Sequence, residues 1–296
     1  GVICKTIYPN YFFFQFLCIL INVTLLMMFF RRYVSNIPLA FMIMLVMSGF
    51  EININLVRNS ISILLFVNAI VFIEKKQFLP FLLVCLLGFT FHSSSLAYIP
   101  MYFIINRKFN KYIMMAIFAV ANVIYLFHIP ILKSLILLVV DYIMPSTKLW
   151  VEAYLSMDLS TGSVLSIGYL ERLLTGILLF CYIDKLREVR NGNNIFVNSM
   201  LFYLCTFLFL SEFRTISLRC SYLFIYAYWI VWIDLIKCFT YRNNKILYLS
   251  FVALYSLLKV YFLNTTAMSE YYNITIENKP YNERLIHFRQ HFNDVK

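Results

Sequence analysis

Charged residues are scarce in this sequence: they make up 13% of its 296 residues, whereas hydrophobic residues make up 62%. A soluble domain usually has about a quarter charged residues and about half apolar ones. The mean hydropathy of +0.78 is correspondingly high. The composition therefore excludes an ordinary soluble domain and indicates a membrane protein.

The sequence also lacks the patterns of disulfide, metal and nucleotide sites. Its seven cysteines are scattered without a C-x-x-C pair, so neither a disulfide framework nor a zinc site is predicted. No second histidine or paired carboxylate stands at metal-ligand spacing, and no P-loop or dinucleotide fingerprint occurs. We therefore predict no metal and no cofactor.

The hydrophobic residues come in long blocks, such as residues 11–30, 113–127, 196–210 and 222–236. Blocks of roughly 17 to 25 residues match the bilayer thickness as helices. An outer-membrane barrel would instead alternate apolar and polar residues in segments of about ten. We therefore predict an all-α, polytopic transmembrane bundle of about ten hydrophobic helices, forming a single membrane domain over residues 1–296.

The net charge of +11 does not indicate nucleic acid, because many basic residues lie in short connections such as Arg31-Arg32 and Lys75-Lys76. Short loops rich in Lys and Arg are typically cytoplasmic. Placing these loops inside gives crossings at residues 11–30, 37–51, 55–73, 112–127, 164–183, 195–210, 218–236 and 246–263.

The same path assigns three segments to the outer side of the membrane. Residues 129–145 are predicted to lie at the interface or to re-enter, and residues 147–162 form the longest external loop. The tail, residues 264–296, is predicted to be external. It should contain a short amphipathic helix, because apolar residues recur at helical spacing from Leu285 to Phe292.

Residues 78–105 are bracketed by basic clusters, yet they number only 28. Two full crossings would need about 40 residues. The sequence therefore predicts two short helices that meet near His92, with the turn reached from the outer side. A single long tilted helix is the alternative, and it would reverse the topology of everything downstream.

The start of the span at residues 55–73 carries polar residues at helical spacing. Glu51, Asn55, Arg58 and Ser62 form one stripe if the helix starts before Glu51. An arginine at the centre of a span costs about 2.5 to 3.5 kcal/mol, so such a stripe should face a cavity. Alternatively, Arg58 reaches the lipid headgroups or pairs with Glu51 as a structural contact.

The stretch SEFRTISLRCSY, residues 211–222, repeats this pattern on another span. One helical face is predicted to carry Glu212, Thr215, Arg219, Tyr222 and Tyr226, and the next face Arg214. Guanidinium is the preferred group for a bidentate grip on phosphate. Arg172 adds a further candidate deeper in its span, and a Glu–Arg network that only fixes helix packing is the alternative.

His92 is a candidate general base, because a histidine can accept a proton near neutral pH. It stands in the predicted helix break, in the stretch FTFHSSSLAY. A lone histidine is more often a hydrogen-bonded structural residue, and the three following serines offer it partners.

Four stretches together resemble the EpsG family of bacterial polysaccharide polymerases, which are relatives of the Wzy O-antigen polymerases. Those that carry the likeness are YFFFQFLCILINVTLLMMFFRRYVSN, NLVRNSISILLFVNAIVFIEKKQFLPFLLVCLLGFTFHSSSLAYIPMYF, GYLERLLTGILLFCYIDKL and FRTISLRCSYLFIYAYWIVW. They cover most of residues 10–236. Members of the family usually begin with further spans and an acidic, tyrosine-rich external segment, which the resemblance leads us to expect before residue 1.

The resemblance implies glycosyl transfer between polyprenyl-diphosphate-linked oligosaccharides at the outer face of the bacterial cytoplasmic membrane. It implies the bilayer, the lipid-linked oligosaccharide and other polysaccharide assembly proteins as partners, and no nucleic acid. By this likeness the functional candidates are Arg58, His92, Arg172, Arg214 and Arg219. Together with the polar helical faces, this gives Arg58, His92, Arg214 and Arg219 as candidate catalytic residues. The candidate substrate-binding residues are Glu51, Asn55, Arg172, Glu212 and Tyr222.

Two other functions fit a basic cavity in a membrane protein. A flippase or transporter for lipid-linked sugars often shows paired repeats with matched broken helices, and this sequence shows one break without a partner. A membrane acyltransferase would also use a histidine, but a neutral acyl ester gives the arginines no anion.

The assignment of basic loops to the inside makes a topological prediction. In a cysteine-free background, a cysteine in place of Arg58 or His92 should react with a membrane-impermeant reagent added outside the cell, whereas one in place of Lys75 or Arg187 should not. Labelling of positions 75 and 93 from the same side would contradict the broken helix.

Overall fold

The structure is a computed structural model that describes residues 6–7, 11–49, 52–53, 56–143, 145–157, 165–264, 282–283, 285–286 and 289–290. Over these residues the chain is almost entirely helical and forms no strand, which confirms the all-α prediction. Contacts divide the chain into two compact units, Gly1–Phe239 and Thr240–Lys296.

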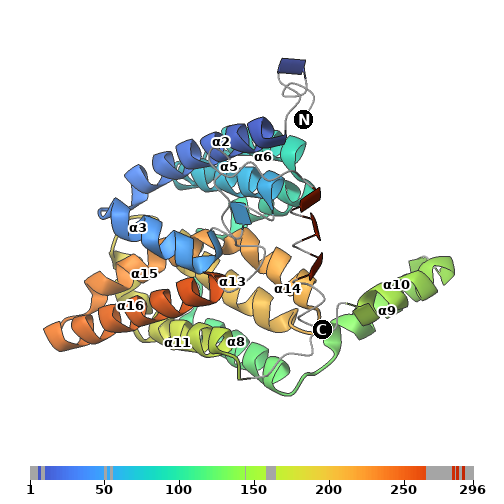
Figure 1. The fold of residues 1–296 in the computed structure, drawn as a ribbon. Helices are drawn as coiled ribbons and strands as arrows, with labels where there is room; N and C mark the ends of the chain where they lie inside the picture. The colour runs from blue at the N-terminus through green and yellow to red at the C-terminus, as the bar shows by residue number, and fades with distance from the viewer. Residues whose placement is uncertain are drawn as a thin grey trace. The chain divides into compact units, whose positions relative to one another are not determined.

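The helices of the first unit follow one another with short connections (Figure 1). They are α2 (Tyr11–Tyr33), α3 (Ile37–Met44), η1 (Leu45–Gly49), α5 (Val57–Glu74), α6 (Phe78–Phe91), η2 (Ser93–Tyr98), α7 (Met101–Ile104), α8 (Lys111–Leu126), α9 (Ile131–Ile143), η3 (Pro145–Thr147), α10 (Lys148–Met157), α11 (Ile167–Cys181), α12 (Ile183–Glu188), α13 (Asn194–Phe209), α14 (Arg214–Ser221), η4 (Tyr222–Phe224) and α15 (Tyr226–Cys238).

Two described helices are long and apolar enough to cross a membrane: Phe13–Tyr33, which lies within α2, and Val57–Glu74, which is α5. The number rises to four if each of two bent pairs is one span, α8 with α9 and α14–η4 with α15. The apolar helices support a membrane protein, while the predicted number of about ten hydrophobic helices stays a prediction.

Helices α2 and α5 lie side by side, and polar side chains tie them together near both ends (Figure 1). The Asn22 amide donates a hydrogen bond of 2.7 Å to Ser60 Oγ near the start of α5. The Tyr33 hydroxyl donates one of 3.0 Å to Glu74 Oε2 at its end. A polar group in apolar surroundings is costly without a partner, so these bonds fix how the two helices pair.

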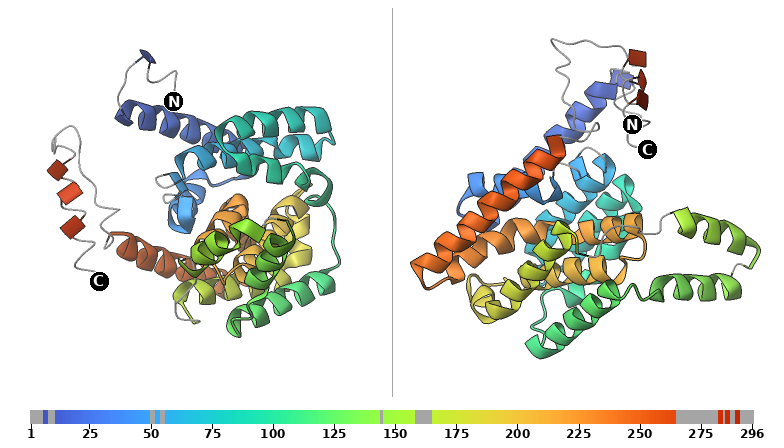
Figure 2. Two further views of the ribbon diagram at one scale, coloured as in Figure 1. Left: turned by 90° about the vertical axis from the view of Figure 1, so that its right-hand side faces the viewer. Right: turned by 60° about the horizontal axis from the view of Figure 1, so that its bottom comes forward.

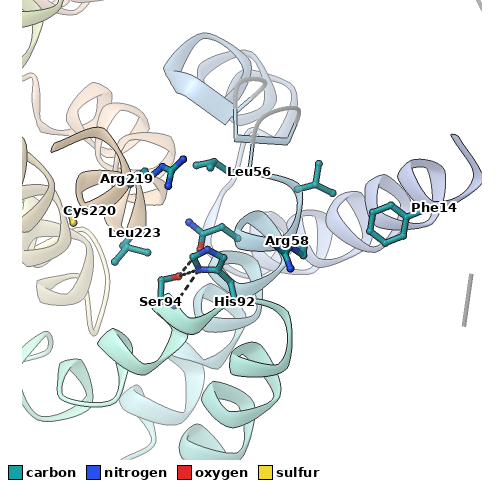
Figure 3. Close-up of a pocket in the computed structure, with 10 residues that line it drawn as sticks. Phe14, Leu56, Arg58, His92, Ser94, Arg219, Cys220 and Leu223 are labelled. Atoms are coloured by element: carbon teal, nitrogen blue, oxygen red, sulfur yellow. Dashed lines mark hydrogen bonds between the residues drawn. The ribbon is translucent and has the colours of Figure 1, made fainter. Parts of the chain in front are cut away.

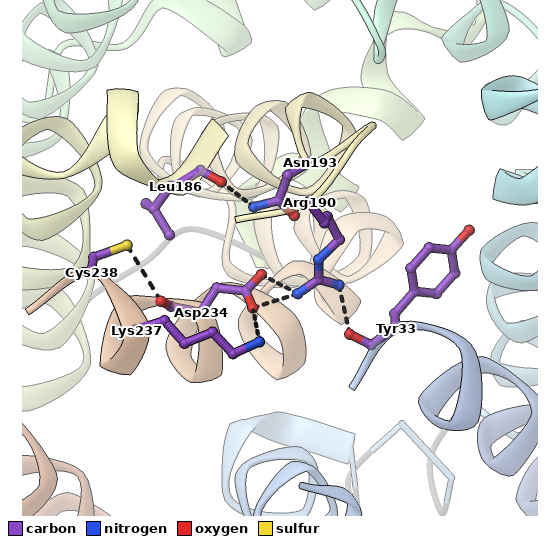
Figure 4. A network of polar contacts seen from close by, with 7 residues as sticks. All are labelled: Tyr33, Leu186, Arg190, Asn193, Asp234, Lys237 and Cys238. Carbon is purple, nitrogen blue, oxygen red and sulfur yellow. Dashed lines mark hydrogen bonds and ion pairs between the residues drawn. The ribbon is translucent and has the colours of Figure 1, made fainter. Parts of the chain in front are cut away.

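A buried ion pair between Arg190 and Asp234 joins α15 to the segment before α13 (Figure 4). Asp234 of α15 is fully buried, and Arg190, just before α13, binds both of its carboxylate oxygens. Lys237 Nζ lies 3.5 Å from the same carboxylate. Arg190 also donates a hydrogen bond of 2.6 Å to the carbonyl oxygen of Tyr33. Removing one partner of such a pair costs about 3 to 5 kcal/mol, so this contact fixes α2, α13 and α15 together.

The segment between the two basic clusters folds back on itself at His92, which has φ −154° and ψ 136° between α6 and η2. The two arms are antiparallel, because the ring of Phe78 at the start of α6 lies 5.0 Å from that of Tyr102 in α7. The two short helices predicted from the sequence are therefore present, and a single long helix over residues 78–105 is wrong.

The helix that carries Arg58 begins later than the predicted polar stripe requires. The residue before α5 has φ −121° and ψ 39°, which is outside the helical range. A continuous helical face from Glu51 to Ser62 is therefore wrong. Glu51 and Asn55 themselves lie outside the described residues.

The span predicted over residues 218–236 is bent by 57° between η4 and α15. This bend separates Tyr226 from the helical face predicted to carry Arg219. Glu212 lies in the turn before α14, and Tyr226 is fully buried beyond the bend.

Helices α9 and α10 pack against each other and extend away from the other helices of the first unit (Figures 1 and 2). α9 meets α8 at 88°, after His128, which has a positive φ of 49°. Most of the external loop predicted over residues 147–162 is helical, because α10 occupies it, and its external position stays a prediction. The pair exposes large apolar side chains, including Tyr142 at 84% and Trp150 at 79%.

The second unit contains α16 (Arg242–Asn264), which includes the crossing predicted over residues 246–263. In the tail, Leu285 is described as helical, whereas Phe288 and Phe292 lie outside the described residues. The predicted amphipathic helix there stays a prediction.

We expect α9 and α10 to lie in the headgroup region of the bilayer, because a helix perpendicular to a crossing helix runs along the membrane plane. The difference in fluorescence between the unaltered chain and Trp150→Phe isolates Trp150 from the buried Trp229 and Trp232. Lipids brominated near the headgroup should quench this difference more than lipids brominated at the chain end. Quenching by aqueous iodide alone would contradict the placement.

Candidate functional site

Segments from distant parts of the chain meet at a cavity of about 490 Å³ (Figure 3). They are the N-terminal part of α2, the first turn of α5, the break at His92 with η2, and the α14–η4 segment. The cavity is lined by Phe14, Leu56, Val57, Arg58, Asn59, His92, Ser94, Arg219, Cys220 and Leu223. Three residues that the sequence singled out in separate stretches, Arg58, His92 and Arg219, therefore lie around one space.

The cavity lies at the end of α5 opposite to the buried ion pair of Arg190. Arg58 and Glu74 are 16 positions apart in α5, which is about 24 Å at about 1.5 Å per residue. Glu74 bonds to Tyr33, whose carbonyl Arg190 binds. Arg58 and the basic residues near Glu74, which are predicted to be cytoplasmic, thus lie at opposite ends of α5.

The first turn of α5 is held in place by Ser60, directly after Arg58 and Asn59. Ser60 Oγ accepts a hydrogen bond of 2.7 Å from Asn22 of α2 and donates one of 2.8 Å to the carbonyl of Val57. These bonds fix the start of α5 against α2. Arg58 and Asn59 consequently line the cavity from a turn that these two bonds hold against α2.

The break at His92 is held by side chains of η2. Ser95 Oγ donates a hydrogen bond of 2.7 Å to a carbonyl of α6, and a Cβ at Gly88 would lie 2.5 Å from that Oγ. Gly88 is thus needed for the close return of the chain. The Tyr98 hydroxyl donates a hydrogen bond of 2.8 Å to the carbonyl of Leu223, which joins the break to η4.

Arg58 and Arg219 are exposed to the cavity. Within the described part of the chain, neither guanidinium has a hydrogen bond or an ion pair. Two like charges near each other repel, so the arrangement favours an anionic ligand. The predicted neutralisation by Glu51 concerns a residue outside the described ones.

The His92 side chain lies outside both helices that are long enough to cross the membrane. Its pKa is lowered from the usual 6.5, chiefly by desolvation and then by the positive charges of Arg58 and Arg219. Its imidazole is therefore mostly neutral at pH 7 and able to accept a proton. Ring atom Nδ1 lies 2.8 Å from Ser94 Oγ, so Nε2 is the nitrogen left for a ligand.

Arg172 does not line this cavity. Its Nη2 donates a hydrogen bond of 3.1 Å to the Tyr203 hydroxyl, and its guanidinium carbon lies 3.8 Å from the ring centre of Phe207. The neighbouring Glu171 is buried and accepts a hydrogen bond of 2.8 Å from Thr175. The contacts of Arg172 join α11 to α13, which fits the packing alternative for this arginine.

Three other candidates also lie away from the cavity lining. Glu212 Oε2 accepts a hydrogen bond of 3.1 Å from the backbone N–H of Lys133 in the first turn of α9. Tyr222 is 5% exposed and packed inside the bundle. Arg214 is exposed at the start of α14. Their predicted roles stay predictions.

Two polar residues of the cavity, Asn59 and Ser94, are not among the site residues predicted from the sequence. The serines after His92 predicted a hydrogen-bond partner for its ring, and Ser94 is that partner. Helical spacing from Arg58 does not point to Asn59, because Asn59 is its direct neighbour in the sequence. The sequence feature that could have indicated Asn59 is a side-chain amide directly after Arg58 at the start of a span.

No group of three His, Cys, Asp or Glu side chains in the described ranges could hold a metal ion. Among the described cysteines, Cys220 lines the cavity, and it forms no disulfide. The binding groups on the cavity wall are therefore guanidiniums, an imidazole, an amide and hydroxyl or thiol groups.

The sequence model of the EpsG family matches residues 1–282 of the chain. The chain belongs to the EpsG family. This confirms the predicted resemblance, and membership of the EpsG family suggests a role like that of a polysaccharide polymerase. Neither the curated proteins nor the solved structures that were searched contain a match to the chain.

We expect the cavity to bind inorganic diphosphate in the purified protein. Arg58→Lys and Arg219→Lys keep the charge but lose the bidentate fork. Hydrogen bonds to charged groups contribute about 1.5 to 3 kcal/mol, so each change should weaken binding about tenfold or more in titration calorimetry. Arg31→Lys, at the other end of α2, is the matched control and should bind normally. Equal binding by all variants would contradict the site.

Proposed function

We propose that this EpsG family member polymerises oligosaccharide units linked to polyprenyl diphosphate, at the outer face of the bacterial cytoplasmic membrane. The observation that supports this function is the cavity in which two guanidiniums without acidic partners among the described residues accompany a neutral imidazole. The product would be an O-antigen, a capsule or an exopolysaccharide.

In the proposed reaction the growing chain leaves its carrier. The bond between the anomeric carbon and the diphosphate oxygen breaks, and its electron pair stays on the departing polyprenyl diphosphate. Arg58 and Arg219 stabilise the charge that develops there. Because this charge is larger in the transition state than in the bound substrate, fixed guanidiniums accelerate the reaction rather than only bind the substrate.

The attacking group is a hydroxyl of the sugar on the second lipid-linked unit. Its oxygen forms the new bond to the anomeric carbon, and its proton passes to Nε2 of His92. A neutral imidazole is required for this step, and the lowered pKa of His92 supplies it. General base catalysis of this kind contributes about 10² to 10⁴ in rate.

The apolar part of the cavity wall suits the carrier lipid. Phe14, Leu56 and Leu223 line the same space as the arginines. They would contact the first isoprene units while the diphosphate meets the guanidiniums, and the rest of the tail would lie between helices or in the bilayer.

Purified protein in detergent should join lipid-linked repeat units into polymer, which a transporter without closed vesicles could not do. His92→Gln should slow this reaction by about 100-fold or more. His128→Gln, which changes a histidine outside the cavity, is the control and should leave the rate unchanged. Polymer formed at the normal rate by His92→Gln would return His92 to a structural role.

The pH profile follows from the direction of the pKa shift. The base must be neutral, so the rate should fall as the pH decreases through the pKa of His92, which lies below 6.5. A rate that falls already above pH 6.5 would contradict this assignment. The measurement is kcat/KM for polymer formation from pH 5 to 8, because kcat/KM reports the pKa of His92 in the protein without bound diphosphate.

A further inference from the structure

The ring of His92 is part of a chain of short hydrogen bonds that ends on α5 (Figure 3). Nδ1 of His92 lies 2.8 Å from Ser94 Oγ, and Ser94 Oγ donates a hydrogen bond of 2.6 Å to Asn59 Oδ1. Asn59 is 4% exposed and belongs to the turn that Ser60 holds. The chain of bonds thus links the helix break to the start of α5.

The order of donors along this chain determines where the proton of His92 sits. A serine hydroxyl has one proton, and Ser94 gives it to Asn59. Ser94 Oγ can then only accept from His92, so Nδ1 carries a proton. In a neutral imidazole that leaves Nε2 without one, which is the state that a general base needs.

A second contact favours the opposite tautomer. The backbone N–H of Ser94 lies 3.2 Å from Nδ1 of His92 and would donate to it if that nitrogen were unprotonated. One nitrogen cannot donate and accept at once. The bonds of 2.8 and 2.6 Å through the hydroxyl are shorter and end on a buried acceptor, so they prevail over the longer contact.

We propose that Asn59 and Ser94 are positioning residues that hold the proton of His92 on Nδ1 and keep Nε2 free to accept the proton of the attacking hydroxyl. This inference rests on the proposed function, because it assigns the machinery of its base. Orienting a base by a third group is a general feature of sites with an activated nucleophile.

Magnetic resonance of histidine labelled with ¹⁵N reads the tautomer without any reaction. The purified chain has four histidines, and His92→Gln identifies the signals of His92 by their loss. Above its pKa, the unaltered chain should show a protonated Nδ1 and an unprotonated Nε2. A protonated Nε2 in the unaltered chain would overturn the proposal.

Two substitutions of Ser94 form a matched pair. Ser94→Ala removes the hydroxyl and leaves the backbone N–H beside Nδ1, so the proton should move, at least in part, to Nε2. Ser94→Thr keeps a hydroxyl and should keep the original tautomer. Asn59→Leu removes the final acceptor and should act like Ser94→Ala. An unchanged tautomer in Ser94→Ala and Asn59→Leu would overturn the proposed relay, which is the chain of hydrogen bonds from His92 through Ser94 to Asn59.

The rate of polymer formation should follow the tautomer. Ser94→Ala should lower kcat about tenfold or more with little change in KM, because the substrate still meets both arginines while the base is masked. Ser94→Thr should restore kcat. A shifted tautomer with a normal kcat would overturn the positioning role.

Failure of this inference can be distinguished from failure of the proposed function. The position of the proton in the unaltered chain is measured without substrate, so the relay can fail while polymer is still made. Absence of polymer from the unaltered chain would instead overturn the proposed function, whatever the tautomer.

Discussion

The free energy needed to keep a guanidinium charged in apolar surroundings governs this structure. The carboxylate of Asp234 offsets this cost for Arg190. The Tyr203 hydroxyl and the ring of Phe207 offset it for Arg172. Both of these arginines hold helices together. Arg58 and Arg219 differ, since they open onto a cavity and lack acidic partners among the described residues. Their partner in function is therefore expected to come from outside the protein.

The break at His92 makes such a cavity possible. In an uninterrupted helix the backbone N–H and C=O groups bond to one another, so only side chains face the surroundings. A break leaves some of these backbone groups without a helical partner, and nearby groups must bond to them. Here Ser95 bonds back to α6, and Tyr98 bonds across to η4. The same contacts that satisfy the break bring it against the segment that carries Arg219. Stability of the turn and assembly of the cavity thus depend on the same residues.

The sequence predicted the parts of this arrangement that depend on local constraints. A segment of 28 residues between basic clusters is too short for two crossings, which indicated the break at His92. The predicted crossings place Arg58, His92, Arg214 and Arg219 near the outer surface of the membrane. The structure brings Arg58, His92 and Arg219 together around the cavity, whereas Arg214 does not line it. Helical spacing failed where it assumed an unbroken helix, as from Glu51 into α5. It also could not show that Arg172 is held by α13, because that contact joins distant parts of the chain.

The proposed reaction also accounts for why the cavity combines two permanent cations with one neutral base. A glycosyl polyprenyl diphosphate carries two negative charges, which Arg58 and Arg219 match. When the glycosyl bond breaks, the diphosphate gains a further negative charge, and the proton lost by the attacking hydroxyl moves to His92. The imidazole becomes positive as the third negative charge appears, so the cavity stays near neutrality throughout. A histidine that was already charged would hold the substrate more tightly but could accept no proton. The low pKa of His92, which its neighbouring arginines help to set, is thus what lets charge balance and proton transfer occur in the same step.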